Sequence, residues 1–135
     1  MEKLGVIADF FVTLQVTFPF RPKGFVDQLI LRLVKEGLDS VIAVRSEYGS
    51  CWVREAETIK RIDQGFIPRK FKEPAYIGIE GLGCATYPIF IRAGHLLGDK
   101  VGIIEIDNPY SSIEVRDKVG LELAKQVVAR WEQGR

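Results

Sequence analysis

The pattern that most constrains this chain is a strand, a helix and a second strand close to its beginning. Asp9 to Val16 carries an apolar run with aromatic and β-branched residues, which predicts a strand. Lys23 to Glu36 places apolar residues at helical spacing, and Gly37 ends that predicted helix. Asp39 to Val44 (DSVIAV) predicts a second strand. This unit favours parallel strands joined by a right-handed crossover.

The rest of the chain continues to alternate between short strands and helices, which predicts a single α/β domain over residues 1–135. The sequence predicts the end of a helix at Glu2–Ile7, strands at Tyr76–Ile79, Val101–Ile106 and Ile113–Val115, a short helix at Tyr87–Arg92, and an amphipathic helix at Asp117–Trp131.

Residues 46–72 form a segment of a different kind, in which charges are mixed with aromatic residues. Asp63–Gly65 is expected to turn the chain between two extended arms. We expect this hairpin-like excursion to leave the main sheet and to contact a second subunit, with Trp52, Phe66 and Phe71 as anchors. The segment also holds a small basic cluster, which is interpreted as a solvated face or as an anion contact across the subunit interface: Arg69, Lys70 and Lys72.

Charge and cysteine content exclude several classes of protein. Lys and Arg (19) almost balance Asp and Glu (18), so nothing indicates broad binding of nucleic acid or of an anionic membrane. The apolar runs are too short to cross a bilayer, and the first residues do not form a signal peptide. Cys51 and Cys84 have no metal-type spacing. A reduced, cytoplasmic protein is the simplest interpretation.

Polar residues follow the first predicted strand. The end of that strand and its connection to the following helix contain Gln15, Thr17 and Arg21. Open α/β sheets bind ligands at the carboxyl ends of their strands, so these residues are candidates for ligand contacts. Gln15 and Arg21 are candidates for contacts to a ligand carboxylate or to hydroxyl groups. The alternative is that they cap a strand end and face solvent. Two glycines, Gly81 and Gly83, are expected to serve an ordinary turn.

Three segments in order resemble the cytidylyltransferases that activate sugar acids, the CMP-sialic acid synthetase family. LQVTFPFR, a helix and DSVIAV are similar to that family's LQPTSPLR, helix and DSV; Phe18 and Phe20 stand where the family has Ser and Leu. Gly83 to Tyr87 is similar to its NGAIY segment. Ser112 to Ala124 is similar to its SIDIDTEEDLKLAE segment.

The resemblance implies a nucleotidyltransferase that transfers CMP from CTP to a sugar acid and releases pyrophosphate. It implies a Rossmann-like, three-layer fold with a mostly parallel sheet. The resemblance also implies roles for particular residues: substrate binding by Gln15, Thr17, Arg21 and Arg116, catalytic roles for Glu114 and Asp117, and Mg²⁺ binding by Glu114. The family's second metal-binding Asp is Arg116 here, which puts a two-carboxylate site in doubt.

The family's first strand and its Gly/Ser/Arg-rich loop, which holds the CTP triphosphate, have no counterpart before Asp9. The sequence therefore predicts an N-terminally truncated version of the fold and an incomplete or inactive enzyme as an isolated chain. The alternative is a non-catalytic, dimeric sugar-acid-binding or assembly module that lost the nucleotide half. A third interpretation is a different nucleotide-sugar transferase of the same superfamily.

Overall fold

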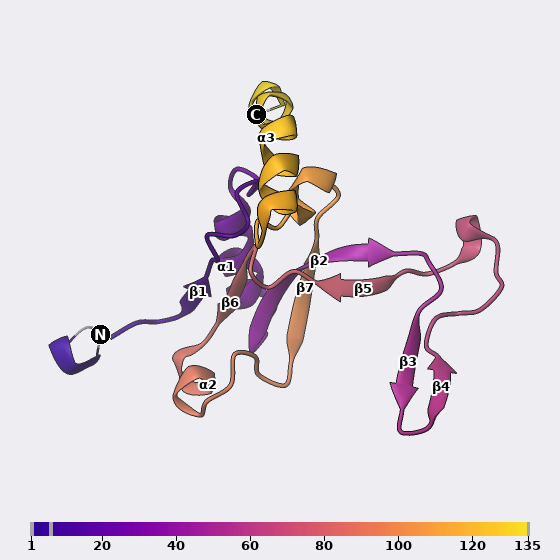
Figure 1. Ribbon diagram of the computed structural model, residues 1–135. Helices are drawn as coiled ribbons and strands as arrows, with labels where there is room; N and C mark the ends of the chain where they lie inside the picture. The colour runs from indigo at the N-terminus through magenta and orange to yellow at the C-terminus, as the bar shows by residue number, and fades with distance from the viewer. Residues whose placement is uncertain (1, 6, 135) are drawn as a thin grey trace.

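The core of the molecule is a five-stranded mixed sheet, with helices and loops packed around it (Figure 1). The computed structural model describes residues 2–5 and 7–134. The strands of this sheet are β1 (Phe11–Thr13), β2 (Ser40–Glu47), β5 (Ala75–Gly78), β6 (Cys84–Thr86) and β7 (Val101–Glu105).

The long strand β2 organises the sheet. On one side it pairs antiparallel with β6 over residues 40–42 and antiparallel with β5 over residues 44–47. On its other side it pairs parallel with β7. β1 pairs antiparallel with β6, which places β6 between β1 and β2. The expectation of a mostly parallel sheet is therefore wrong. The chain leaves the sheet at the carboxyl end of β2 and re-enters it at the same end, so β5 and β6 are antiparallel to β2.

Helix α1 (Phe25–Lys35) connects β1 to β2 as predicted, and the two strands run in the same direction although β6 separates them. The helix begins after Gly24, which has a left-handed φ of 73°. Phe25, Leu29 and Leu33 are fully buried and form the core together with sheet residues such as Val41 and Ala85. Their spacing of four residues places them on one face of the helix.

The remaining elements match the sequence in part. The short helix α2 (Pro88–Arg92) and the C-terminal helix α3 (Lys118–Gln133) are confirmed. Only Ala124 is buried on α3 among its described residues, and Trp131 meets Phe20 edge-on with ring centroids 5.6 Å apart. The described residues also contain three 3₁₀ turns: η1 (Glu2–Leu4), η2 (Arg69–Phe71) and η3 (Pro109–Ser112). The predicted helix end at Glu2–Ile7 is η1; Val6, within that range, lies outside the described residues.

The predicted strand at Ile113–Val115 is wrong. These residues are extended, but they do not join the sheet. Instead, the Val115 amide donates to the Thr17 carbonyl at 2.8 Å, which ties the segment before α3 to the loop after β1. A three-residue apolar alternation predicts an extended backbone, but it does not predict which partner that backbone finds.

Within residues 46–72, β3 (Trp52–Glu55) and β4 (Thr58–Arg61) pair antiparallel as a two-stranded sheet beside the main one (Figure 1). The connection is Ala56–Glu57, with Ala56 at a φ of 51°. The expectation of a turn between the arms at Asp63–Gly65 is therefore wrong. Asp63 instead accepts a hydrogen bond from the Gly65 amide at 3.1 Å, so this polar tripeptide bends the chain after β4.

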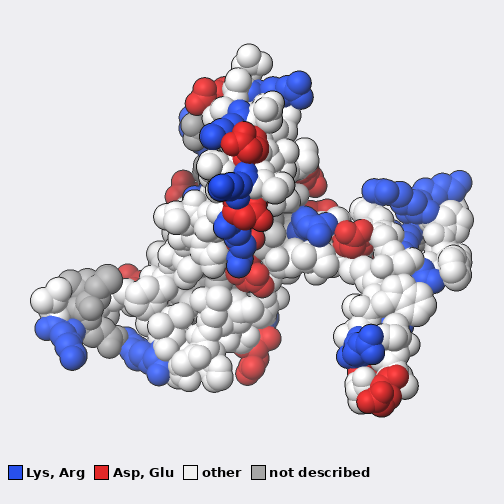
Figure 2. Space-filling view, in the orientation of Figure 1, with Lys and Arg blue, Asp and Glu red and all other residues white. Residues whose placement is uncertain are grey.

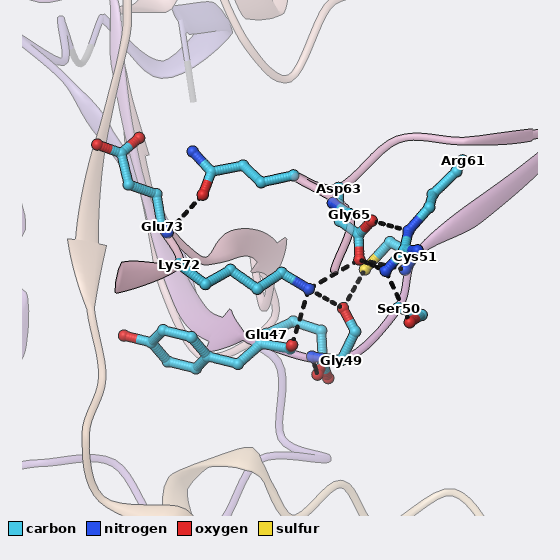
Figure 3. A network of polar contacts seen from close by, with 11 residues as sticks. Glu47, Gly49, Ser50, Cys51, Arg61, Asp63, Gly65, Lys72 and Glu73 are labelled. Carbon is cyan, nitrogen blue, oxygen red and sulfur yellow. Dashed lines mark hydrogen bonds and ion pairs between the residues drawn. The ribbon is translucent and has the colours of Figure 1, made fainter. Parts of the chain in front are cut away.

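Asp63 is the centre of a polar network at the base of this hairpin (Figure 3). Its carboxylate is only 2% exposed and pairs with Lys72 at 2.8 Å and with Arg61. Lys72 also donates to the Tyr48 carbonyl at 3.1 Å. Hydrogen bonds from Arg61 and Lys72 hold the pKa of Asp63 well below its usual range. The predicted basic cluster is thus divided, because Lys72 is buried in this network while Arg69 and Lys70 are exposed.

No helix in the described part of the chain is both long enough and apolar enough to cross a membrane.

Candidate functional site

Three segments distant in sequence meet beside the sheet and form the candidate site. The loop after β1 is fastened to the segment before α3 by the backbone bond from Val115 to Thr17. The same loop is fastened to the loop between β5 and β6, because the Gln15 amide donates to the Gly81 carbonyl at 2.8 Å. In addition, Thr17 Oγ1 donates to Glu114 Oε1 at 3.4 Å. The site is therefore built on backbone contacts.

Two adjoining hollows lie where these segments meet. The first has a volume of about 400 Å³ and includes apolar residues such as Phe18, Leu96 and Leu97 in its wall. The second has a volume of about 540 Å³ and is lined by Gln15, Thr17, Glu114, Val115 and Arg116. Gln15, Glu114 and Arg116 line both hollows. These volumes are in the range of small-molecule sites. The structure thus brings together four residues that the sequence analysis singled out.

Glu114 and Arg116 form an ion pair within the site. Arg116 Nε lies 2.5 Å from Glu114 Oε1, and the arginine side chain is 72% exposed while the glutamate is 26% exposed. The pair combines a partly buried carboxylate with an exposed guanidinium that a ligand anion can engage.

Arg21 does not line either hollow. Its Nε donates to the Leu82 carbonyl at 2.6 Å, and its Nη2 donates to the carbonyls of Gln15 and Gly81 at 3.2 and 3.5 Å. Burial lowers the pKa of the guanidinium. Arg21 thus connects the loop after β1 to the loop between β5 and β6, and both loops contribute residues to the first hollow. These contacts give Arg21 a positioning role.

Asp117 also has a structural task. Its Oδ1 accepts the Gly120 amide at 2.8 Å, so Asp117 is the N-cap of α3. It does not line either hollow.

Two glycines allow close packing beneath the site. A Cβ atom on Gly81 would lie 2.5 Å from the Phe18 ring and 2.6 Å from Gln15 Oε1. A Cβ atom on Gly83 would lie 2.5 Å from the Phe25 ring and 2.7 Å from Leu29. Neither position has the left-handed backbone that a turn glycine often adopts. These glycines therefore serve contact between loop, sheet and helix rather than turn geometry.

Glu80 lines the first hollow and was missed by the sequence analysis. It lies two residues after the end of β5, and its carboxylate lies over Gly78, where an added Cβ atom would leave that carboxylate no room. The available signal was an acidic residue at the end of a predicted strand, next to a glycine.

Two further residues lie near the site without contributing to it. Cys84 is buried, and burial, with a smaller effect from Glu80, raises the pKa of its thiol to about 11. A buried thiol of this kind is unreactive. His95 is exposed.

The residues do not fit a metal ion held by the protein alone. Glu114 is paired with Arg116, and Asp117 caps a helix. Within the described residues, no group of three or more His, Cys, Asp or Glu side chains is arranged to hold an ion. Mg²⁺ prefers several oxygen ligands in octahedral geometry.

Comparison with known proteins gives a result at the level of fold. No family model matches the chain, and no curated protein matches its sequence. Among solved structures, the fold matches a 4-diphosphocytidyl-2C-methyl-D-erythritol synthase from Anaerococcus prevotii with a TM-score of 0.66 and 14% identity. The match covers 95% of this chain and 64% of that chain, so this chain spans less than two thirds of its structural neighbour. The chain therefore has a mixed α/β fold similar to that of this synthase.

Proposed function

We propose that this chain takes part in cytidylyl transfer, and that its two adjoining hollows bind the hydroxyl-bearing acceptor, a sugar acid. The observation that carries the proposal is the meeting of Thr17 and Glu114, 97 residues apart, in one hollow. Both lie in segments that resemble sugar-acid cytidylyltransferases, and the fold matches a structure whose name describes a cytidylyl product.

In this proposal the chain's own residues bind and orient the acceptor. The Gln15 amide and the Thr17 hydroxyl hydrogen-bond to hydroxyl groups, and Arg116 moves from Glu114 to the acceptor's carboxylate. The acceptor's hydroxyl oxygen then bonds to the α-phosphorus of CTP, the bond to pyrophosphate breaks, and Glu114 accepts the hydroxyl proton. Positioning and charge neutralisation supply most of the rate in such transfers.

The test has two measurements on the same preparation. Calorimetry measures the binding of sugar acids to the chain, and a coupled assay measures pyrophosphate release after CTP is added, with and without Mg²⁺, whose role when bound is to neutralise triphosphate charge. We expect binding that Thr17→Val and Arg116→Gln weaken. Glu132→Gln, at the exposed end of α3, is the matched control. Failure of every sugar acid to bind would contradict the proposal.

A second candidate function is a sugar-acid-binding module without catalysis. The observation in its favour is the Glu114–Arg116 pair, which stands where the resemblance implies two metal-binding carboxylates. The two candidates differ in one result. Sugar-acid binding with no pyrophosphate release from CTP, even in the presence of Mg²⁺, favours the module.

We also propose that the chain forms a homodimer through residues 46–72, the segment that contains the hairpin of β3 and β4. Trp52, Phe66 and Phe71 are 57%, 99% and 68% exposed. The Arg61 guanidinium lies over the Trp52 and Phe66 rings, with distances of 5.5 and 4.5 Å to their centroids. This arrangement orders large aromatic side chains at a surface, and ordered aromatic and arginine side chains are typical anchors of interfaces.

A further inference from the structure

We propose that Glu80 selects the acceptor: it binds the hydroxyl-bearing end and excludes a carboxylate there, which directs any anionic group of the acceptor toward Arg116. The inference deepens the proposed function and rests on it. It assigns a specificity role to a residue that the resemblance does not single out.

The first observation is that the Glu80 carboxylate is available. The residue is partly buried and lines the first hollow. Among the described residues, none donates a hydrogen bond to this carboxylate or pairs with it. By contrast, Glu114 in the same hollow is paired with Arg116 at 2.5 Å. Glu80 is therefore the free acceptor of the first hollow.

The second observation is that local structure holds Glu80 in place. Glu80 lies between β5 and the loop that Arg21 fastens through the carbonyls of Gly81 and Leu82. Its carboxylate lies over Gly78, so any larger residue at position 78 would displace this carboxylate. A glycine at the end of β5 thus makes room for the Glu80 side chain.

The third observation is the distribution of charge. Glu80 lines only the first hollow, whereas Glu114 and Arg116 line both. Because Glu114 and Arg116 neutralise each other, the unpaired Glu80 makes the first hollow negative. A partly buried carboxylate attracts hydroxyl donors and repels a second carboxylate. A ligand with an anion at one end and hydroxyls at the other matches this polarity.

The experiment compares two probes that differ at one carbon. D-erythritol 4-phosphate carries a phosphate at one end and a hydroxymethyl group at the other, and 4-phospho-D-erythronate carries a carboxylate in place of that hydroxymethyl group. Calorimetry on the full chain, without nucleotide, measures both dissociation constants. We expect D-erythritol 4-phosphate to bind at least about tenfold more tightly than 4-phospho-D-erythronate. The hydroxyl group of the first probe donates a hydrogen bond to the Glu80 carboxylate, whereas the carboxylate of the second probe is repelled by it.

Three variants separate the contributions. Glu80→Gln keeps the size and removes the charge, and it should reduce the preference for the polyol to less than about threefold. Arg116→Gln should weaken both probes to a similar extent and leave their ratio unchanged, since both carry the phosphate. Gly78→Ala should act like Glu80→Gln by displacing the carboxylate. Glu132→Gln should change neither constant.

Three results would overturn the inference. If the wild-type chain binds both probes equally, or if Glu80→Gln leaves a tenfold preference intact, Glu80 does not select the acceptor. If neither probe binds, the inference is also wrong. If neither probe binds, the proposed function survives when sugar acids bind in the calorimetry described above, and it fails together with the inference when they do not.

Discussion

Arg21 holds together the two loops that carry the candidate site. Its guanidinium donates to three backbone carbonyls, those of Leu82, Gln15 and Gly81. Because Gly81 and Leu82 are buried, their carbonyls have little access to water when this donor is removed. The side chain contributes to ligand binding only through the loops it fastens.

We predict that Arg21→Met lowers the free energy of unfolding by about 1–3 kcal/mol, because charged hydrogen bonds to backbone carbonyls are lost. Urea unfolding followed by circular dichroism measures the change. Arg54→Met, on an exposed strand of the hairpin, is the control and should stay within about 0.5 kcal/mol of wild type. Equal effects of the two substitutions would contradict the positioning role of Arg21.

The two cysteines should react at different rates. Cys84 is buried and its thiol pKa is raised to about 11, so almost none of it is thiolate near neutral pH. Cys51 is partly exposed. We predict that an aromatic disulfide reagent at pH 8 modifies one thiol rapidly in the folded chain and two in denaturant. Rapid modification of both thiols in the folded chain would show that Cys84 is accessible.

At the scale of elements, the contact between α1 and the sheet depends on Gly83. Its missing Cβ leaves room for Phe25 and Leu29, which are 1% and 0% exposed. We predict that Gly83→Ala destabilises the chain by about 1–3 kcal/mol, because the buried core has no space for another methyl group. Gly134→Ala, where an added Cβ would make only ordinary 3.8 Å contacts with the carbonyls of Arg130 and Trp131, is the control for denaturant unfolding. A neutral Gly83→Ala would mean that α1 packs less tightly than described.

The hairpin base should make stability depend on acid pH. The folded pKa of Asp63 lies below its unfolded value, so the unfolded chain takes up the proton first as pH falls. The contribution of Asp63 is therefore complete above about pH 4 and is lost progressively at lower pH. We predict a steeper loss of stability below pH 4 in wild type than in Asp63→Asn.

Urea unfolding between pH 7 and pH 2.5 measures this difference. Asp99→Asn, an exposed carboxylate near α2, is the control and should follow the wild-type slope. Parallel pH profiles for wild type and Asp63→Asn would contradict the role of this network.

Elements were easier to predict from the sequence than their pairing. The 3.6-residue spacing of Phe25, Leu29 and Leu33 predicts α1 because one helical face must be buried. Nothing local in Cys84–Thr86 indicates that this short strand inserts between β1 and β2. Strand order depends on contacts between distant segments. In this chain the order is set by β5 and β6, which re-enter the main sheet after the hairpin.

The candidate site was predictable to a similar degree. Gln15, Thr17, Glu114 and Arg116 were singled out by two resembling segments, and the structure brings them together. The segment resemblance did not predict that Arg21 and Asp117 bond to backbone groups, because those bonds depend on how loops close. Glu80 was missed because its availability appears only when the other carboxylates have found partners.

For the whole molecule, the exposed aromatic side chains of the hairpin predict a dimer. We expect sedimentation equilibrium to give twice the chain mass, and we expect Trp52→Ser combined with Phe66→Ser to give the mass of a single chain. Leu31→Ser, which changes an exposed residue of α1 that is 53% accessible, is the control and should leave the dimer intact. A single-chain mass for the wild-type protein would contradict the proposed dimer.

In the proposed function, the loop after β1 and the segment before α3 together form the acceptor site. The most direct test is a titration of the ¹⁵N-labelled chain with a sugar acid, followed by the backbone amide signals. We predict saturable shifts that are largest at Gln15–Thr17 and at Glu114–Arg116, two regions 97 residues apart that meet through Thr17 and Glu114. Shifts confined to the hairpin or to α3, or no saturable shift in either predicted region, would contradict the claim.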